Sequence, residues 1–202
     1  GAAETGAAVI NHPLTSKVAF TGSTEVGKII MRSLAGTEKK MTLELGGKAA
    51  NIVFDDAPLD QAVEGIVNGI FFNQGHVCCA GSRLLVQESI ADEVLAKLKR
   101  RIATLRVGDP LDKNTDLGAI NSAEQLAKII DLVKSGVEEG ADLKLDGRGL
   151  TLQGHEKGFF IGPSLFDNVK PGMVSYENEI FGPVLQVVRA ETLEEAAALP
   201  SK

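Results

Sequence analysis

Short apolar runs that suit β-strands alternate along this chain with longer stretches of helical periodicity, and this alternation limits the possible folds more than any other feature. The expected strands cover residues 17–21, 41–45, 51–54, 83–87, 143–145, 159–165 and 184–189. The expected helices cover residues 26–34, 59–71, 90–105, 121–139 and 192–199. Strands that alternate with helices predict an α/β fold with a mainly parallel sheet flanked by helices.

The expected helix after Pro58 has one apolar face. Its apolar residues fall on one stripe from Leu59 to Phe71, so this helix should pack against the sheet. It should end near Gly75, where glycine permits a left-handed turn. A second glycine, Gly140, should close the helix at 121–139 in the same way.

The overall composition excludes several classes of partner. The 202 residues carry a formal net charge of −6 and no long cluster of Lys or Arg, which argues against nucleic acid or an anionic membrane as a partner. No apolar run approaches the roughly 18 residues of a membrane span, and the first residues lack a basic segment followed by an apolar one. We therefore expect a soluble, cytoplasmic protein.

The two cysteines, Cys78 and Cys79, are adjacent, and no third cysteine is present to pair with them. Adjacent cysteines rarely form a structural disulfide, which indicates a reducing compartment. The three histidines are scattered and no Cys-x-x-Cys spacing occurs, so the sequence predicts no metal site.

Two reactive side chains stand on glycine-containing segments. Cys78 lies in Asn73-Gln74-Gly75-His76-Val77-Cys78-Cys79-Ala80-Gly81, and Glu44 begins Glu44-Leu45-Gly46-Gly47-Lys48. A thiol among small residues and a carboxylate on a Gly-Gly turn suggest a nucleophile and its general base. The alternatives are that both cysteines are buried core residues and that Glu44 is a surface residue at a strand end.

Four motifs occur together in one order. The turn at 22–27 (Gly-Ser-Thr-Glu-Val-Gly), the Glu44 motif, the Cys78 motif and Glu179-Ile180-Phe181-Gly182-Pro183-Val184 follow one another at the approximate spacing of the aldehyde dehydrogenase superfamily. The interval from Glu44 to Cys78 is the one that this family keeps between base and nucleophile. The chain therefore resembles part of an aldehyde dehydrogenase, less than half of a typical member.

The resemblance implies NAD(P)-dependent oxidation of an aldehyde to a carboxylic acid through a thiohemiacetal and a thioester, with NAD or NADP as cofactor. Cys78 corresponds to the nucleophile and Glu44 to the general base, whose pKa a nearby apolar pocket would raise. A helix N-terminus behind the cysteines would favour the thiolate. The cofactor-binding positions are Gly22, Ser23, Val26, Leu45, Glu179 and Phe181.

Three details distinguish this chain within the resemblance. His76 stands where the family generally has Gln, and an imidazole two residues before a thiol leaves a Cys-His dyad open beside an ordinary loop histidine. Glu44 favours water as acyl acceptor. Residues 146–163, however, resemble methylmalonate-semialdehyde dehydrogenases, whose chemistry acylates coenzyme A.

On the family pattern, residues 1–47 are the C-terminal piece of the dinucleotide-binding domain, and residues 48–202 are the catalytic domain, incomplete at its C-terminus. A parallel sheet cut in this way should expose apolar edges, so the chain either self-associates, as a homo-oligomer, or is a designed minimal version. Two other functions remain open: a cofactor-independent thiol esterase that uses Cys78, and a non-catalytic structural or assembly fragment of the same family.

Overall fold

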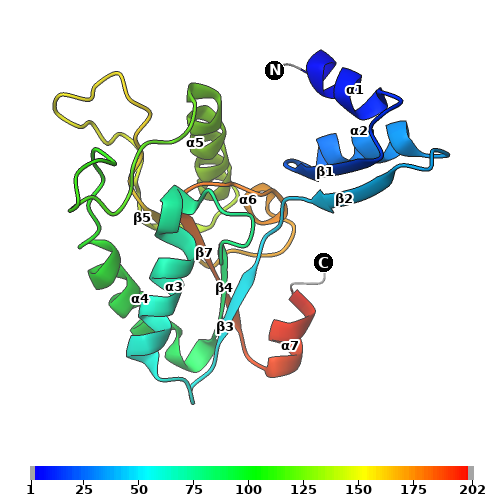
Figure 1. Ribbon diagram of the computed structural model, residues 1–202. Helices are drawn as coiled ribbons and strands as arrows, with labels where there is room; N and C mark the ends of the chain where they lie inside the picture. Colours follow the sequence, from blue (N-terminus) through cyan, green and yellow to red (C-terminus); the bar gives the residue numbers. More distant parts are fainter. Residues whose placement is uncertain (1–2, 200–202) are drawn as a thin grey trace. The chain divides into compact units, whose positions relative to one another are not determined.

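The computed structural model describes residues 3–199, and its contacts divide the chain into two compact units, residues 1–47 and 48–202 (Figure 1). The first unit contains α1 (Ala3–Asn11), β1 (Lys17–Thr21), α2 (Thr24–Leu34) and β2 (Lys40–Glu44). Strands β1 and β2 pair in parallel, with Thr21 opposite Glu44. Its small core consists of Val18, Ile30 and Leu34.

The second unit is built on a five-stranded sheet. Its elements are β3 (Ala50–Val53), α3 (Leu59–Phe71), the 3-10 helix η1 (Phe72–Gly75), β4 (Arg83–Gln87), α4 (Glu88–Ile102), α5 (Ala123–Glu138), β5 (Asp142–Leu145), β6 (Ser164–Asp167), α6 (Val174–Glu177), β7 (Val184–Ala190) and α7 (Leu193–Ala198). The strand order is β3-β4-β7-β6-β5, and only the β5–β6 pair is antiparallel. The predicted α/β fold with a mainly parallel, helix-flanked sheet is confirmed.

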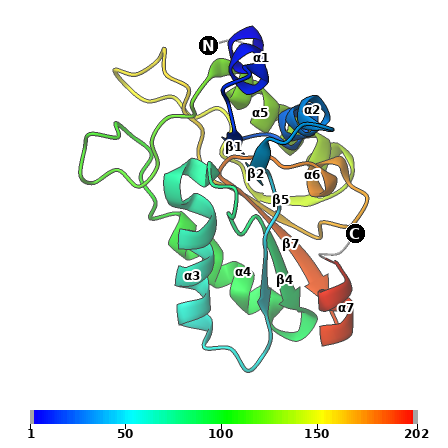
Figure 2. The same ribbon diagram turned by 45° about the vertical axis from the view of Figure 1, so that its right-hand side comes forward.

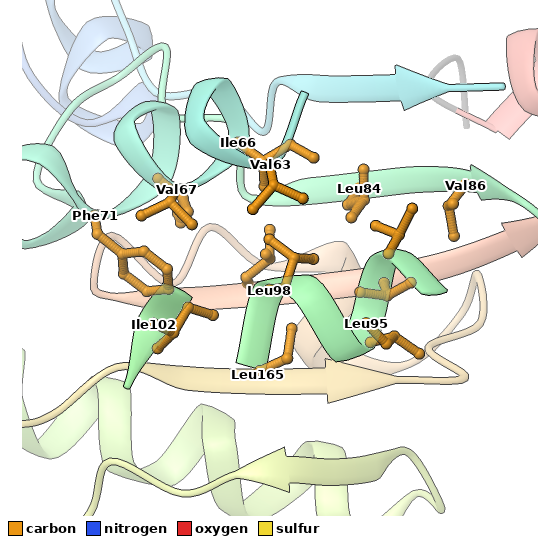
Figure 3. Packing of buried hydrophobic residues seen from close by; sticks show 14 of the residues in the cluster. Val63, Ile66, Val67, Phe71, Leu84, Val86, Leu95, Leu98, Ile102 and Leu165 are labelled. Atoms are coloured by element: carbon orange, nitrogen blue, oxygen red, sulfur yellow. The ribbon is translucent and has the colours of Figure 1, made fainter. Parts of the chain in front are cut away.

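Alternation along the strands divides the core of this unit into two layers. Leu84 and Val86 of β4 point to the layer that contains α3 and α4, whereas Leu85 between them points to the layer that contains α5. In both views of the ribbon, α3 and α4 lie side by side over the sheet (Figures 1 and 2). Figure 3 shows the first layer, with Val63 of α3 facing Leu98 of α4 and Phe71 of α3 beside Ile102 of α4.

The helix ends follow local chemistry. The Ser122 hydroxyl caps α5 by accepting a 3.1 Å hydrogen bond from the Gln125 N–H. Gly140 follows that helix with φ +91°, so the expected glycine stop is confirmed. Among residues 3–199, no helix is long and apolar enough to cross a membrane.

One expected strand is partly wrong, and one helix was not predicted. Residues 159–163 do not belong to a strand, because β6 begins only at Ser164. These residues bond to other loops instead: Phe159 C=O accepts from Ile120 N–H, and Gly162 N–H donates to Gly147 C=O. Helix α1 was not predicted, because its sequence has no clear apolar stripe; in the structure none of its residues is buried.

Candidate functional site

The candidate site of the second unit lies where three parallel strands begin. Because β3, β4 and β7 are parallel neighbours, the segments that lead into them meet at one edge of the sheet. These segments are Lys48 before β3, residues 76–82 before β4 (the cysteine loop) and residues 178–183 before β7 (the glutamate loop). Backbone hydrogen bonds join them, since Arg83 N–H donates to Ala49 C=O at 3.2 Å and Gln186 N–H to Ser82 C=O at 3.0 Å.

The cysteine loop presents two free thiols to solvent. Cys78 and Cys79 are both exposed, so the alternative that they are core residues is wrong. The turn around them is closed by Ala80 N–H, which donates to Val77 C=O at 3.0 Å. The chain then enters β4 rather than a helix, so the expected helix N-terminus behind the cysteines is also wrong.

The segment just before the cysteines packs tightly on the glutamate loop. Gly75 has φ +74°, and a Cβ atom built on it would lie 2.2 Å from the Gly182 carbonyl oxygen. The next residue, His76, stacks its ring on Phe181, with centroids 5.3 Å apart and planes 10° apart. Burial lowers the pKa of the His76 imidazole, and its buried Nε2 has no hydrogen-bond partner among the described residues. No hydrogen bond joins His76 to Cys78 in the described chain, so the structure gives the dyad no support.

The glutamate loop is held from a third element. Gln125 of α5 donates through Nε2 to the carbonyl oxygens of Ile180 at 2.9 Å and Phe181 at 3.0 Å. Phe181 has φ +55°, a left-handed conformation that is costly for a residue with a side chain. Glu179 and Phe181 are both partly buried. The loop is therefore a fixed part of the site.

Lys48 and Arg83 tie the strand starts together, and sequence reasoning missed both. The Lys48 ammonium donates to the Glu177 carbonyl oxygen, and the Lys48 carbonyl oxygen accepts from Arg83 Nε at 3.1 Å. Arg83 is only 5% exposed; it also donates to the Tyr176 hydroxyl at 3.1 Å and lies over that ring at 5.1 Å. Burial and the Arg83 charge lower the pKa of Lys48, while Glu177 and Glu179 act in the opposite direction.

The first unit brings the other predicted positions together on a strand, turn and helix. Ser23 caps α2 by accepting from Val26 N–H at 3.3 Å, and Gly22 N–H donates to the Glu44 carbonyl oxygen at 3.0 Å. Glu44 itself is exposed, so the described residues do not form the apolar surroundings expected for it.

A nucleotide would fit this turn. A Cβ on Gly27 of α2 would lie 2.6 Å from Leu45 Cδ2, so the glycine leaves room for the Leu45 side chain to lie against the helix. Close helix–strand packing behind a turn with free N–H groups is the arrangement that nucleotide-binding folds use to approach phosphate.

The predicted site residues thus form two sets. Cys78, Glu179 and Phe181 lie in neighbouring loops of the second unit, and Gly22, Ser23, Val26, Glu44 and Leu45 lie in the first. In residues 3–199, no group of three or more His, Cys, Asp or Glu side chains is placed to hold a metal ion.

Comparison with known proteins gives consistent matches. The model of the aldehyde dehydrogenase family matches residues 1–200. Human retinal dehydrogenase 2 is 47% identical over 191 residues, which cover 94% of this chain and 36% of the relative.

Solved structures match as well. The methylmalonate-semialdehyde dehydrogenase of Oceanimonas doudoroffii is 34% identical with a TM-score of 0.95, over 98% of this chain and 41% of that one. The betaine aldehyde dehydrogenase of Staphylococcus aureus, solved with NAD⁺, is 37% identical with a TM-score of 0.92, over 96% and 39% of the two chains. The chain thus spans about two fifths of the length of these relatives.

Proposed function

The chain belongs to the aldehyde dehydrogenase family, and from this premise we propose that it carries the catalytic-cysteine part of an NAD(P)-dependent enzyme that oxidises an aldehyde to a carboxylic acid. The observation that carries the proposal is the exposed, free Cys78 thiol on a loop that packs beside Glu179 and Phe181. An exposed thiol on an ordered turn can reach a substrate, whereas a buried one cannot.

Cys78 is the proposed nucleophile. Its thiolate adds to the aldehyde carbon, a C–S bond forms, and the carbonyl electron pair moves to oxygen to give a thiohemiacetal. Bound NAD(P) would act as the acceptor of the hydride that leaves this carbon. The re-formed carbonyl is then a thioester on Cys78.

Glu44 is the proposed general base. It takes a proton from the water that attacks the thioester carbon, after which the C–S bond breaks and the electron pair returns to the Cys78 sulfur. The exposure of Glu44 within the first unit leaves its carboxylate accessible for this task. Water as acyl acceptor gives a free carboxylic acid.

The remaining predicted positions have proposed binding roles. Gly22, Ser23 and Val26 would hold the cofactor pyrophosphate at the start of α2, with Leu45 beside it, because the positive end of the helix dipole favours an anion there. Glu179 would bind the nicotinamide ribose hydroxyls, and Phe181 would pack beside the nicotinamide ring. We assign residues 1–47 to the end of a dinucleotide-binding domain and residues 48–202 to most of a catalytic domain.

The first test separates the chemical steps. The purified chain is mixed with nitrophenyl acetate, and nitrophenol release is compared in the parent, Cys78→Ala, Cys79→Ala and Glu44→Gln. Release should fall to background in Cys78→Ala and persist in Cys79→Ala, because only the first thiol is the nucleophile. Glu44→Gln should lower the rate about a hundredfold or more, the usual contribution of a general base.

Aldehyde oxidation is then followed as formation of reduced nicotinamide. Oxidation that needs Cys78 supports the proposal. Ester cleavage without oxidation at saturating NAD would favour a cofactor-independent thiol esterase. Release that is indifferent to Cys78 would contradict both enzymatic proposals and leave a structural fragment of the family.

A further inference from the structure

We propose that His76 is a positioning residue: its ring, stacked on Phe181, fixes the cysteine loop against the glutamate loop and thereby sets the orientation of Cys78. The proposal rests on the proposed function only in taking Cys78 as the reactive thiol.

Among residues 3–199, this stacking is the one aromatic ring contact between the two loops. Centroids 5.3 Å apart with planes 10° apart lie within the range of favourable offset stacking. Burial lowers the pKa of the imidazole, which favours the neutral ring in this stack. The ring makes no hydrogen bond through Nε2 within residues 3–199, so its contribution to the site comes from packing.

Both partners of the stack are anchored through their backbones. His76 N–H donates to Asn73 C=O at 2.9 Å, and its carbonyl oxygen accepts from Asn73 Nδ2 at 3.2 Å. The Phe181 carbonyl oxygen accepts from Gln125 at 3.0 Å. Because each ring stands on a fixed backbone, the stack transmits the position of one loop to the other.

The cysteines follow His76 directly. Only Val77 separates the stacked residue from Cys78, and the turn is short, closing from Ala80 N–H to Val77 C=O. A change in the His76 side chain therefore acts on the start of that turn. A side chain without a ring would remove the ring stacking at this point of the loop.

The test measures the alkylation rate of Cys78 by iodoacetamide, followed by peptide mass spectrometry in a Cys79→Ser background. Iodoacetamide reacts directly with an accessible thiol. The test of the stack can therefore succeed or fail independently of whether the chain cleaves esters. His76→Ala and Phe181→Ala should each slow alkylation about threefold or more, since a loosened turn samples orientations that turn the thiol away from solvent. The double variant should be no slower than either single variant.

Conservative variants identify the cause. His76→Phe keeps a ring without the nitrogen and should stay within about twofold of the parent, whereas His76→Gln should behave like His76→Ala. His155→Ala is the matched control, because His155 meets Phe160 edge-on at 5.9 Å in a different loop. This variant should leave the alkylation rate of Cys78 unchanged.

Three results would overturn the proposal. The first is an unchanged alkylation rate in His76→Ala. The second is a double variant in which the two single-variant effects on the alkylation rate multiply. The third is a parent-like alkylation rate in His76→Gln but not in His76→Phe, which would assign the role to a polar atom of the side chain. As a measurement of the contact itself, proton NMR of His76 should show its pKa return toward the usual value in Phe181→Ala. An unaltered titration would count against the stack whatever the alkylation rates.

Discussion

The close approach of Gly75 to Gly182 makes a sharp prediction: Gly75→Ala should destabilise the second unit far more than a glycine substitution of the same backbone type elsewhere. Two costs act at Gly75. Its φ of +74° lies in the left-handed region, which costs a residue with a Cβ about 1–2 kcal/mol. The added methyl would also lie 2.2 Å from the Gly182 carbonyl oxygen and 2.5 Å from its carbon, which are backbone atoms that cannot rotate away.

The clash adds to the backbone cost. Forcing one extra carbon into a packed region costs about 1–3 kcal/mol. The two terms together predict a loss of about 2–5 kcal/mol in the free energy of unfolding. Gly140→Ala is the matched control: its φ is +91° and nothing lies within 4 Å of the added Cβ, so it should lose only the backbone term.

The chain contains one tyrosine and no tryptophan, which provides the assay. Tyr176 is fully buried in the second unit, so its fluorescence during urea unfolding reports on that unit. Equal losses in Gly75→Ala and Gly140→Ala would refute the reasoning, because they would mean that the loops separate at no cost. Ester cleavage should also fall in Gly75→Ala and persist in Gly140→Ala.

Three further predictions use the same unfolding assay. Leu84→Ala, at a fully buried core position, should cost about 2–5 kcal/mol, whereas Leu111→Ala, at a residue 90% exposed, should stay within about 0.5 kcal/mol of the parent. Arg189→Met should cost about 3 kcal/mol, because it removes the 2.8 Å partner of Asp167, whose side chain is 1% exposed; a loss below about 1 kcal/mol would show that Lys144, 3.7 Å from the same carboxylate, and the Asn168 N–H suffice for Asp167. The pKa of His76 is lowered in the folded chain, so as the pH falls through 6.5, the usual pKa of histidine, the unfolded chain binds a proton there that the folded chain does not. The free energy of unfolding should therefore fall with pH, and it should fall less in His76→Phe. Parallel pH profiles of the two proteins would contradict this.

The sequence predicted those strands and helices whose apolar residues follow a clear periodicity. The strand Arg83–Gln87 is found at its predicted bounds, and the helix at 121–139 differs by two residues at its start and one at its end. Residues 159–163 failed because an aromatic and β-branched run also suits an extended loop, and only the bonds to Ile120 and Gly147 distinguish the two. Local patterns do not report partners that are distant in the sequence.

The site residues divide in the same manner. Cys78 and Glu179 carry reactive groups on recognisable motifs, which made them visible in the sequence. Lys48 bonds the carbonyl oxygen of Glu177, just before the glutamate loop, and Gln125 bonds a carbonyl oxygen within that loop; a lysine or glutamine at such positions looks like any surface residue until the fold is known. Three predicted parallel strands would have implied that the segments before β3, β4 and β7 share an edge, but not which side chains bridge them.

Arg83 shows why this edge needs a long, charged side chain. It is the first residue of β4, between β3 and β7, and pairs in register with Ala50 on one side and Gln186 on the other. From this central position its guanidinium reaches the Lys48 carbonyl oxygen and the Tyr176 hydroxyl, which in turn donates to the Leu199 carbonyl oxygen at 2.9 Å.

An apolar residue at position 83 would leave the Lys48 carbonyl oxygen without its arginine donors, at about 1–3 kcal/mol, whereas the Tyr176 hydroxyl would keep its hydrogen bond to Leu199. A lysine could reach only one of them well, because its ammonium lacks the planar set of donors that lets one guanidinium bond in two directions. Since Lys48 also anchors Glu177, loss of Arg83 would loosen the start of β3 and the approach to the glutamate loop together. The buried arginine is therefore best understood as the link that makes three chain segments one rigid edge, on which an exposed thiol can be held in place.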